Sequence, residues 1–157
     1  MDQKKLLLIP KIEEGIVIDH IPAGLGLKLM GLMRRYPDMR DTVITLGVNY
    51  NSPKLGSKDM IKIALRELPA EVLEQLSILA PGVTIKRITD YSVDKKYVLQ
   101  MPDKLESLVR CRNPNCITNW EGSLPTRFSR VAPDSDKYKC THCERIFLLD
   151  RLEKVRP

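Results

Sequence analysis

The chain contains four cysteines, and they form two closely spaced pairs in its last third. Cys111 and Cys116 flank Arg-Asn-Pro-Asn, and Cys140 and Cys143 flank Thr-His. Two short-spaced pairs allow four thiolates to converge on one ion, and four sulfurs complete the tetrahedral coordination of a structural zinc. The turn-forming residues inside the first pair suit the bend that brings two sulfurs to one metal. The sequence therefore predicts one structural Zn²⁺ bound by all four cysteines.

The competing interpretation is two disulfide bonds, which would need an oxidising compartment. The chain begins Met-Asp-Gln-Lys-Lys, and this start lacks the apolar segment and small-residue cleavage site of a secretory signal. We therefore expect thiolates rather than disulfides, and a cytoplasmic protein. A catalytic zinc normally keeps an open position or takes histidine and carboxylate ligands, so four cysteines favour a structural role.

Composition fits a globular protein with no membrane span. Of 157 residues, 43% are hydrophobic and 29% are charged. Apolar runs such as Leu6–Ile9 are far shorter than a membrane-spanning helix requires. The formal net charge is +6, and the basic residues are spread along the chain. A diffuse excess of this kind fits a solvated surface or an anionic ligand, and does not decide between them.

The chain divides into two regions of different character. Up to Met101, strand-like and helix-like segments alternate without a cysteine, and after Pro102 come short segments, turn residues and all four cysteines. Proline and polar residues at Met101-Pro102-Asp103 indicate a linker or hinge. We expect one domain over residues 1–101 and a small zinc domain over residues 102–157.

Hydrophobic periodicity in the first region alternates between two and 3.6 residues. It predicts strands at 6–9, 16–18, 42–49, 58–65, 83–88 and 91–101, and helices at 23–36 and 69–80, with prolines at the helix boundaries. The inner strand–helix–strand–strand–helix–strand order is that of a ferredoxin-like split βαβ fold, which is α+β. Both helices then cover one face of an antiparallel sheet and leave the other for a ligand or subunit. In the second region, 126–131 and 145–149 resemble strands, so this domain is expected to be β-rich.

Three sequence features together are similar to one known family. They are Gly-Ile-Val-Ile-Asp-His-Ile-Pro at 15–22, Lys-Asp-Met-Ile-Lys-Ile at 58–63, and the two cysteine pairs. Over nearly its whole length the chain resembles the regulatory chain of prokaryotic aspartate carbamoyltransferase. The resemblance implies a non-catalytic subunit in the allosteric control of pyrimidine biosynthesis. Its N-terminal domain would bind the nucleotide effectors CTP and ATP, with UTP as a further candidate. Its zinc domain would dock on the catalytic chain, and regulatory homodimers would bridge catalytic trimers in the cytoplasm.

The resemblance also implies a nucleotide site made of twelve residues from three segments. These are Ile9, Lys11, Ile12, Val17, Asp19, His20, Lys58, Lys62, Ile88, Tyr91, Val93 and Lys96. Lys96 and His20 can pair with a triphosphate, Asp19 can accept hydrogen bonds from ribose hydroxyls, and Lys62 can reach sugar or base. Backbone groups near Ile12 and Tyr91 could contact the base edge. Since the chain has no GxxxxGK[ST] loop, side-chain cations would hold the phosphates.

Some residues depart from the family pattern or have a simpler explanation. Pro10, Ile16 and Lys86 differ from common family residues, and a cation at Lys86 could change the preference between pyrimidine and purine. Taken alone, Tyr91 and Val93 would be core residues. Trp120, the one tryptophan, would be a packing residue covering the zinc domain, and His142 would be exposed and uncoordinated.

Two other functions are compatible with parts of the sequence. A nucleic-acid-binding zinc ribbon would explain the basic pI and the cysteines. However, aromatic residues are only 5% of the chain and the basic residues do not cluster, so no stacking platform is evident. A zinc hydrolase would need an open coordination position and a nearby acid or base, and His20 and His142 are the two histidines available. We therefore expect neither a nucleic-acid partner nor catalytic residues.

Overall fold

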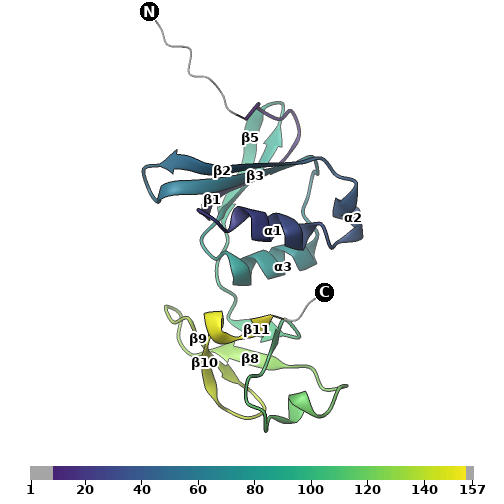
Figure 1. Ribbon diagram of the computed structural model, residues 1–157, viewed down its shortest axis with the longest axis vertical. Coiled ribbons are helices and arrows are strands. Elements are labelled where there is room, and N and C mark those ends of the chain that lie inside the picture. Colours follow the sequence, from purple (N-terminus) through teal and green to yellow (C-terminus); the bar gives the residue numbers. More distant parts are fainter. Residues whose placement is uncertain (1–8, 155–157) are drawn as a thin grey trace, which may run out of the picture. The chain divides into compact units, whose positions relative to one another are not determined.

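The computed structural model describes residues 9–154, and they divide into two compact units between Gln100 and Met101 (Figure 1). The first unit contains β1 (Gly15–Pro22), α1 (Gly26–Met33), α2 (Pro37–Arg40), β2 (Ile44–Ser52), β3 (Gly56–Ile63), α3 (Ala70–Leu79), β4 (Thr84–Thr89) and β5 (Ser92–Val98). Within the described residues, no helix is long and apolar enough to cross a membrane.

The five strands of the first unit form one antiparallel sheet in the order β2-β3-β1-β4-β5. The order β1-α1-β2-β3-α3-β4 in the chain, with β1 and β3 in the middle of the sheet, is the split βαβ arrangement. The predicted α+β fold with a ferredoxin-like domain is therefore confirmed. Helices α1 and α3 lie on the same side of the sheet (Figure 1).

The core lies between that face of the sheet and the helices. Alternating strand residues point into it, and they meet the apolar stripes of α1 and α3. The strands contribute Ile16, Ile18, Ile61, Ile63 and Ile85, and the helices Leu29, Met33, Val72 and Leu76. Because side chains alternate along a strand, Val17, Lys62 and Lys86 lie on the opposite face, which these helices leave uncovered.

The first helix is shorter than predicted, because a carboxylate from another strand fixes its start. Gly24 has a left-handed φ of 92°, and Asp59 Oδ2 accepts the N–H groups of Gly24 and Gly26, each at 2.9 Å. These bonds cap α1 at Gly26 instead of residue 23. At the other end Tyr36 is extended, as expected before proline, and Pro37 begins the separate helix α2. The prediction of one helix over 23–36 was therefore wrong at both ends.

Strand β2 contains a bulge that the alternating pattern did not reveal. Its register with β3 shifts between Gly47 and Tyr50, and Asn49 has φ of 59°. Asp59 Oδ1 accepts the Asn49 N–H at 3.1 Å. Val48, which alternation placed with Ile44 and Leu46, is consequently 49% exposed. Of the strand predicted at residues 6–9, only Ile9 lies within the described residues, and it occupies a bend.

A tight turn joins β4 and β5. Asp90 and Tyr91 both have positive φ, 49° and 60°, as a two-residue hairpin turn of the primed type requires. The Tyr91 N–H also donates to the Glu13 carbonyl at 3.2 Å. The last strand of the sheet therefore begins at Ser92 rather than Tyr91, and it ends at Val98 rather than Met101.

The second unit is built from very short strands. They are β6 (Lys104–Glu106), β7 (Val109–Arg110), β8 (Arg127–Arg130), β9 (Lys137–Cys140), β10 (Ile146–Leu148) and β11 (Glu153–Lys154). Strands β10-β9-β8-β6 form one sheet and β11-β7 another. Strands β8 and β10 lie within the segments predicted at 126–131 and 145–149. The others were missed, since strands of two to four residues show too little periodicity to detect.

Candidate ligand face and metal centre

The uncovered face of the sheet carries a row of cations across four strands. The strand register places Lys62 of β3 opposite Val17 of β1, Val17 opposite Lys86 of β4, and Lys86 opposite Lys96 of β5. Directly opposed residues in antiparallel strands point to the same face. The three lysines thus lie in one row across the sheet, with the buried Val17 between Lys62 and Lys86.

At one side of this row, a bulge in β1 presents Asp19 and His20. The register of β1 with β3 shifts between Ile18 and Ile21, and His20 has φ of 58°. The His20 N–H turns back to donate to Asp19 Oδ1 at 2.7 Å. Such bulges often re-aim side chains next to functional sites.

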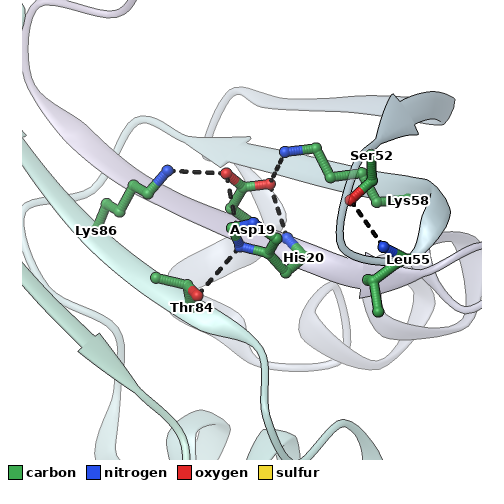
Figure 2. Close-up of polar contacts among 7 residues, drawn as sticks. All are labelled: Asp19, His20, Ser52, Leu55, Lys58, Thr84 and Lys86. Atoms are coloured by element: carbon green, nitrogen blue, oxygen red, sulfur yellow. Dashed lines mark hydrogen bonds and ion pairs between the residues drawn. The ribbon is translucent and has the colours of Figure 1, made fainter.

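Asp19 is the centre of an ion-pair cluster (Figure 2). Lys58 Nζ donates to its Oδ1 at 2.7 Å and Lys86 Nζ to its Oδ2 at 2.8 Å, although the Asp19 side chain is only 5% exposed. Burial alone would raise the pKa of the Asp19 carboxyl. Hydrogen bonds from Lys58, Lys86 and the His20 N–H instead hold that pKa far below its ordinary value. The carboxylate is therefore ionised throughout the neutral range.

His20 completes the cluster. Its Nδ1 lies 3.2 Å from Thr84 Oγ1, and its side chain is partly exposed. Burial lowers the pKa of His20 from its ordinary value; Asp19 opposes this, and the charges of Lys58 and Lys86 add to it. These influences favour the neutral imidazole in the free chain, and an anion bound beside it would favour the protonated form.

The other predicted ligand residues fall into two groups. Ile88 of β4 lies opposite Val93 of β5, which adds apolar surface to the same face, next to Tyr91 in the turn. Both Tyr91 and Val93 are exposed, so the alternative that they are core residues is wrong.

The residues before β1 form the second group. Lys62 Nζ donates to the Pro10 carbonyl at 2.6 Å, and burial lowers the pKa of Lys62. That bond ties the segment containing Ile9, Lys11 and Ile12 to the cation row. Lys11 itself points to solvent, and Ile9 and Ile12 are half-buried.

The twelve expected site residues include neither Lys86 nor Thr84, although a cation at Lys86 was expected to affect the preference between pyrimidine and purine. Strand alternation could have predicted both positions. In a strand over 83–88, residues 84, 86 and 88 share one face, so Thr84 and Lys86 lie on the same face as the expected ligand residue Ile88.

The second unit brings all four cysteines to one point. Their sulfur atoms lie within 4.8 Å of one another, with Cys111 Sγ 3.6 Å from Cys143 Sγ and Cys116 Sγ 3.8 Å from Cys140 Sγ. Sulfurs bonded at about 2.3 Å to a tetrahedral zinc lie about 3.8 Å apart, whereas a disulfide needs about 2.05 Å. The arrangement therefore fits a single metal ion and not two disulfides.

Polar groups hold the cysteine loops in place. Asn119 Nδ2 donates to the carbonyls of Cys111 and Asn113, and the Asn115 N–H donates to Asn113 Oδ1. Burial raises the pKa of the Cys111 thiol and of the Cys140 thiol. Burial would also raise the pKa of Cys143, but hydrogen bonds with Asn113 and Arg145 lower it to about 7. A cation that stabilises all four thiolates is what this buried cluster requires.

His142 and Trp120 lie close to the cysteine pairs in the sequence, and neither side chain binds in the sulfur cluster. His142 does not join the sulfur cluster, and its Nε2 lies 3.1 Å from the Pro125 carbonyl. Trp120 is 77% exposed, and its Nε1 donates to the Pro114 carbonyl at 2.9 Å. The expectation that Trp120 packs over this domain is therefore wrong, because the turn after Cys116 carries the indole outward.

Comparisons with known proteins agree with both units. Residues 7–100 match the family model for the aspartate carbamoyltransferase regulatory chain, allosteric domain, and residues 103–153 match the model for the metal binding domain of the same chain. Neither match supports a nucleic-acid-binding zinc ribbon.

Curated relatives extend over most of the chain. The aspartate carbamoyltransferase regulatory chain of Pyrococcus abyssi is 40% identical over 139 residues, covering 88% of this chain and 91% of the relative. That of Methanothermobacter thermautotrophicus is 37% identical over 155 residues, covering 98% of each. Two matched domains in the same order and near-complete coverage lead to one conclusion: the chain belongs to the family of aspartate carbamoyltransferase regulatory chains, non-catalytic subunits of an enzyme of pyrimidine biosynthesis.

Proposed function

We propose that the N-terminal unit binds nucleoside triphosphate effectors on the uncovered face of its sheet. The observation that carries the proposal is the convergence of Lys62, Lys86 and Lys96 in one row beside the Asp19–His20 bulge. A triphosphate carries several negative charges, and ammonium groups on one open face can neutralise them without a phosphate-binding loop. CTP and ATP are the proposed effectors, with UTP as a further candidate.

The proposed role of each residue in this site follows from its position on the sheet. Lys96, His20 and the lysines beside Asp19 face the phosphates. Val17, Ile88 and Val93 supply apolar surface for the base, with Tyr91 at the turn. Ile9, Lys11 and Ile12 flank the site from the segment that Lys62 holds through the Pro10 carbonyl.

Replacing Lys96 with Ala tests this site. Lys96 should contribute a charge-assisted contact worth about 1.5–3 kcal/mol, so the variant should bind CTP at least about tenfold more weakly in calorimetry. Lys95→Ala is the matched control, since Lys95 is the preceding residue of β5 and lies opposite Arg87, on the other face. Equal CTP affinity in Lys96→Ala and wild type would refute the assignment.

The metal in the second unit is proposed to be Zn²⁺, bound by Cys111, Cys116, Cys140 and Cys143. Four thiolates with near-tetrahedral spacing suit zinc and leave no open position for catalysis. Free thiols as metal ligands also suit a reducing compartment, which supports a cytoplasmic location. Metal analysis of the purified chain should give about one zinc per chain.

The metal-binding unit, residues 102–157, is proposed to dock on the catalytic chain of aspartate carbamoyltransferase. Its surface exposes Ile117 and Trp120 beside the first cysteine pair, and Ile146 on β10. Exposed aromatic and aliphatic side chains are typical interface anchors. Trp120→Ala should therefore weaken co-purification with the catalytic chain while zinc content stays normal.

The effector unit, residues 1–101, is proposed to pair with a second copy of itself. β2 is an edge strand, and Val43 and Val48 are exposed on and beside it. An edge with exposed apolar side chains is a ready surface for strand pairing unless a partner covers it. Val48→Lys should convert a dimer to a monomer in analytical ultracentrifugation, without changing zinc content.

A further inference from the structure

The Asp19 carboxylate has little capacity left for a ligand. Its Oδ1 already accepts from Lys58 Nζ and from the His20 N–H, each at 2.7 Å, and its Oδ2 accepts from Lys86 Nζ at 2.8 Å. A carboxylate oxygen has about two acceptor sites, so Oδ1 is saturated and Oδ2 has one left. The side chains of Lys58 and Lys86 are themselves only 16% and 22% exposed. A ribose hydroxyl could therefore reach only the one free site on Oδ2, and a second hydroxyl could bond to Asp19 only by displacing a donor already in place.

Lys58 and Lys86, in contrast, each keep N–H donors that Asp19 does not use. Each ammonium has three N–H groups and uses one on Asp19. Lys58 and Lys86 approach the carboxylate from opposite sides (Figure 2). Without the carboxylate between them these like charges would repel, so Asp19 holds them at fixed positions on the face. The trio carries a net positive charge and adjoins Lys96, which lies opposite Lys86.

We propose that Asp19 is a positioning residue that holds Lys58 and Lys86 as a preformed phosphate-binding pair, with Lys86 the residue that selects for phosphate number. This inference rests on the proposed nucleotide site. In this inference Asp19 holds the two lysines in place, and recognition of the ribose hydroxyls is not its main role. The site therefore discriminates strongly among mono-, di- and triphosphates and weakly between ribose and 2′-deoxyribose.

Titration calorimetry of the full-length, zinc-loaded chain with CTP, CMP and dCTP tests this assignment. For the wild type, we expect CTP to bind at least about tenfold tighter than CMP, and dCTP to bind within about twofold of CTP. Lys86→Met keeps the aliphatic stem, removes the charge and frees Asp19 Oδ2. It should lower the CTP-to-CMP affinity ratio by roughly threefold or more and raise the CTP-to-dCTP ratio by a similar factor. Lys95→Met, on the opposite face of β5, should leave both ratios unchanged.

The outcomes separate this inference from the proposed function. Normal CTP binding with both ratios unchanged in Lys86→Met would overturn the assignment of Lys86 and leave the nucleotide site standing. A wild-type preference for CTP over dCTP above about fivefold would show that the ribose hydroxyl is read, and would overturn the role given to Asp19. Absence of saturable CTP binding by the wild type would overturn the proposed function and this inference together.

Discussion

The N-terminal unit packs two amphipathic helices on one face of a five-stranded sheet, whereas the C-terminal unit arranges strands of two to four residues around four thiols. In the first unit the core lies between sheet and helices, so the opposite face can carry charged residues at no expense to packing. In the second, the buried apolar residues among those described, cysteines apart, are Leu105, Val109, Phe128, Tyr138, Leu149 and Leu152. So small a core needs a metal to fold. Apolar packing therefore stabilises the first unit, and metal binding is expected to stabilise the second.

The largest effect should follow removal of one metal ligand. Structural zinc supplies on the order of 10 kcal/mol in small domains, so Cys140→Ser should unfold the second unit and release the catalytic chain. Since the first unit has its own core, it should remain folded. Zinc analysis, co-purification and NMR spectra of the variant check this. Normal zinc content together with normal assembly would contradict a structural role for the metal.

The complementary change is a cavity in the first unit. Ile61 is fully buried in β3 among helix and strand side chains, so Ile61→Ala should cost about 2–5 kcal/mol of unfolding free energy. Calorimetry should show the melting transition of the first unit shifting down while zinc content stays at its wild-type level. Leu27→Ala, at an exposed position of α1 outside the proposed dimer edge, is the control. Loss of zinc from Ile61→Ala would mean that the two units do not fold independently.

A smaller effect concerns communication between the units. If nucleotide binding and docking reside in different units, allosteric coupling has to cross the boundary near Met101. Such coupling is typically about 1–3 kcal/mol and is reciprocal. A flexible Gly-Ser insertion after Met101 should preserve CTP affinity and zinc content. The factor by which CTP and a substrate analogue change each other's affinity should, however, fall towards one. Intact coupling in that variant would indicate direct contact between the effector unit and the catalytic chain.

The smallest effect should be on pH dependence. Burial lowers the pKa of His20 in the free chain, and a bound phosphate would raise it. Binding then takes up a proton, so the advantage of wild type over His20→Asn in CTP affinity should grow as pH falls from about 8 to about 6. Asn is chosen because it tolerates the left-handed backbone at this position. A constant advantage across that range would exclude His20 as a phosphate contact.

The contrast between the units also explains what the sequence could predict. Long periodic segments revealed the split βαβ order, because each strand and helix of the first unit buries one face. The helix start at Gly26 and the exposure of Val48 both depend on Asp59, whose carboxylate acts across the fold on three backbone N–H groups. No local pattern encodes such contacts. In the second unit cysteine spacing predicted the metal cluster, but β7 and β11 are too short to leave a pattern.

The candidate site divides in the same way. Residue types and resemblance identified Asp19, His20 and Lys58 as site residues, and the structure brings these three together. Their mutual pairing could not be foreseen, since it depends on the bulge in β1 and on the register with β4. Lys86 could have been included from strand alternation alone.

The most direct test of the central claim, that effector binding belongs to the first unit and the metal only to the second, is a CTP titration before and after chelation of zinc. Independent units predict CTP affinities that agree within about twofold in the two states, while the second unit loses its structure. Loss of CTP binding on removal of zinc would contradict the account, because the nucleotide site would then depend on the folded metal-binding unit.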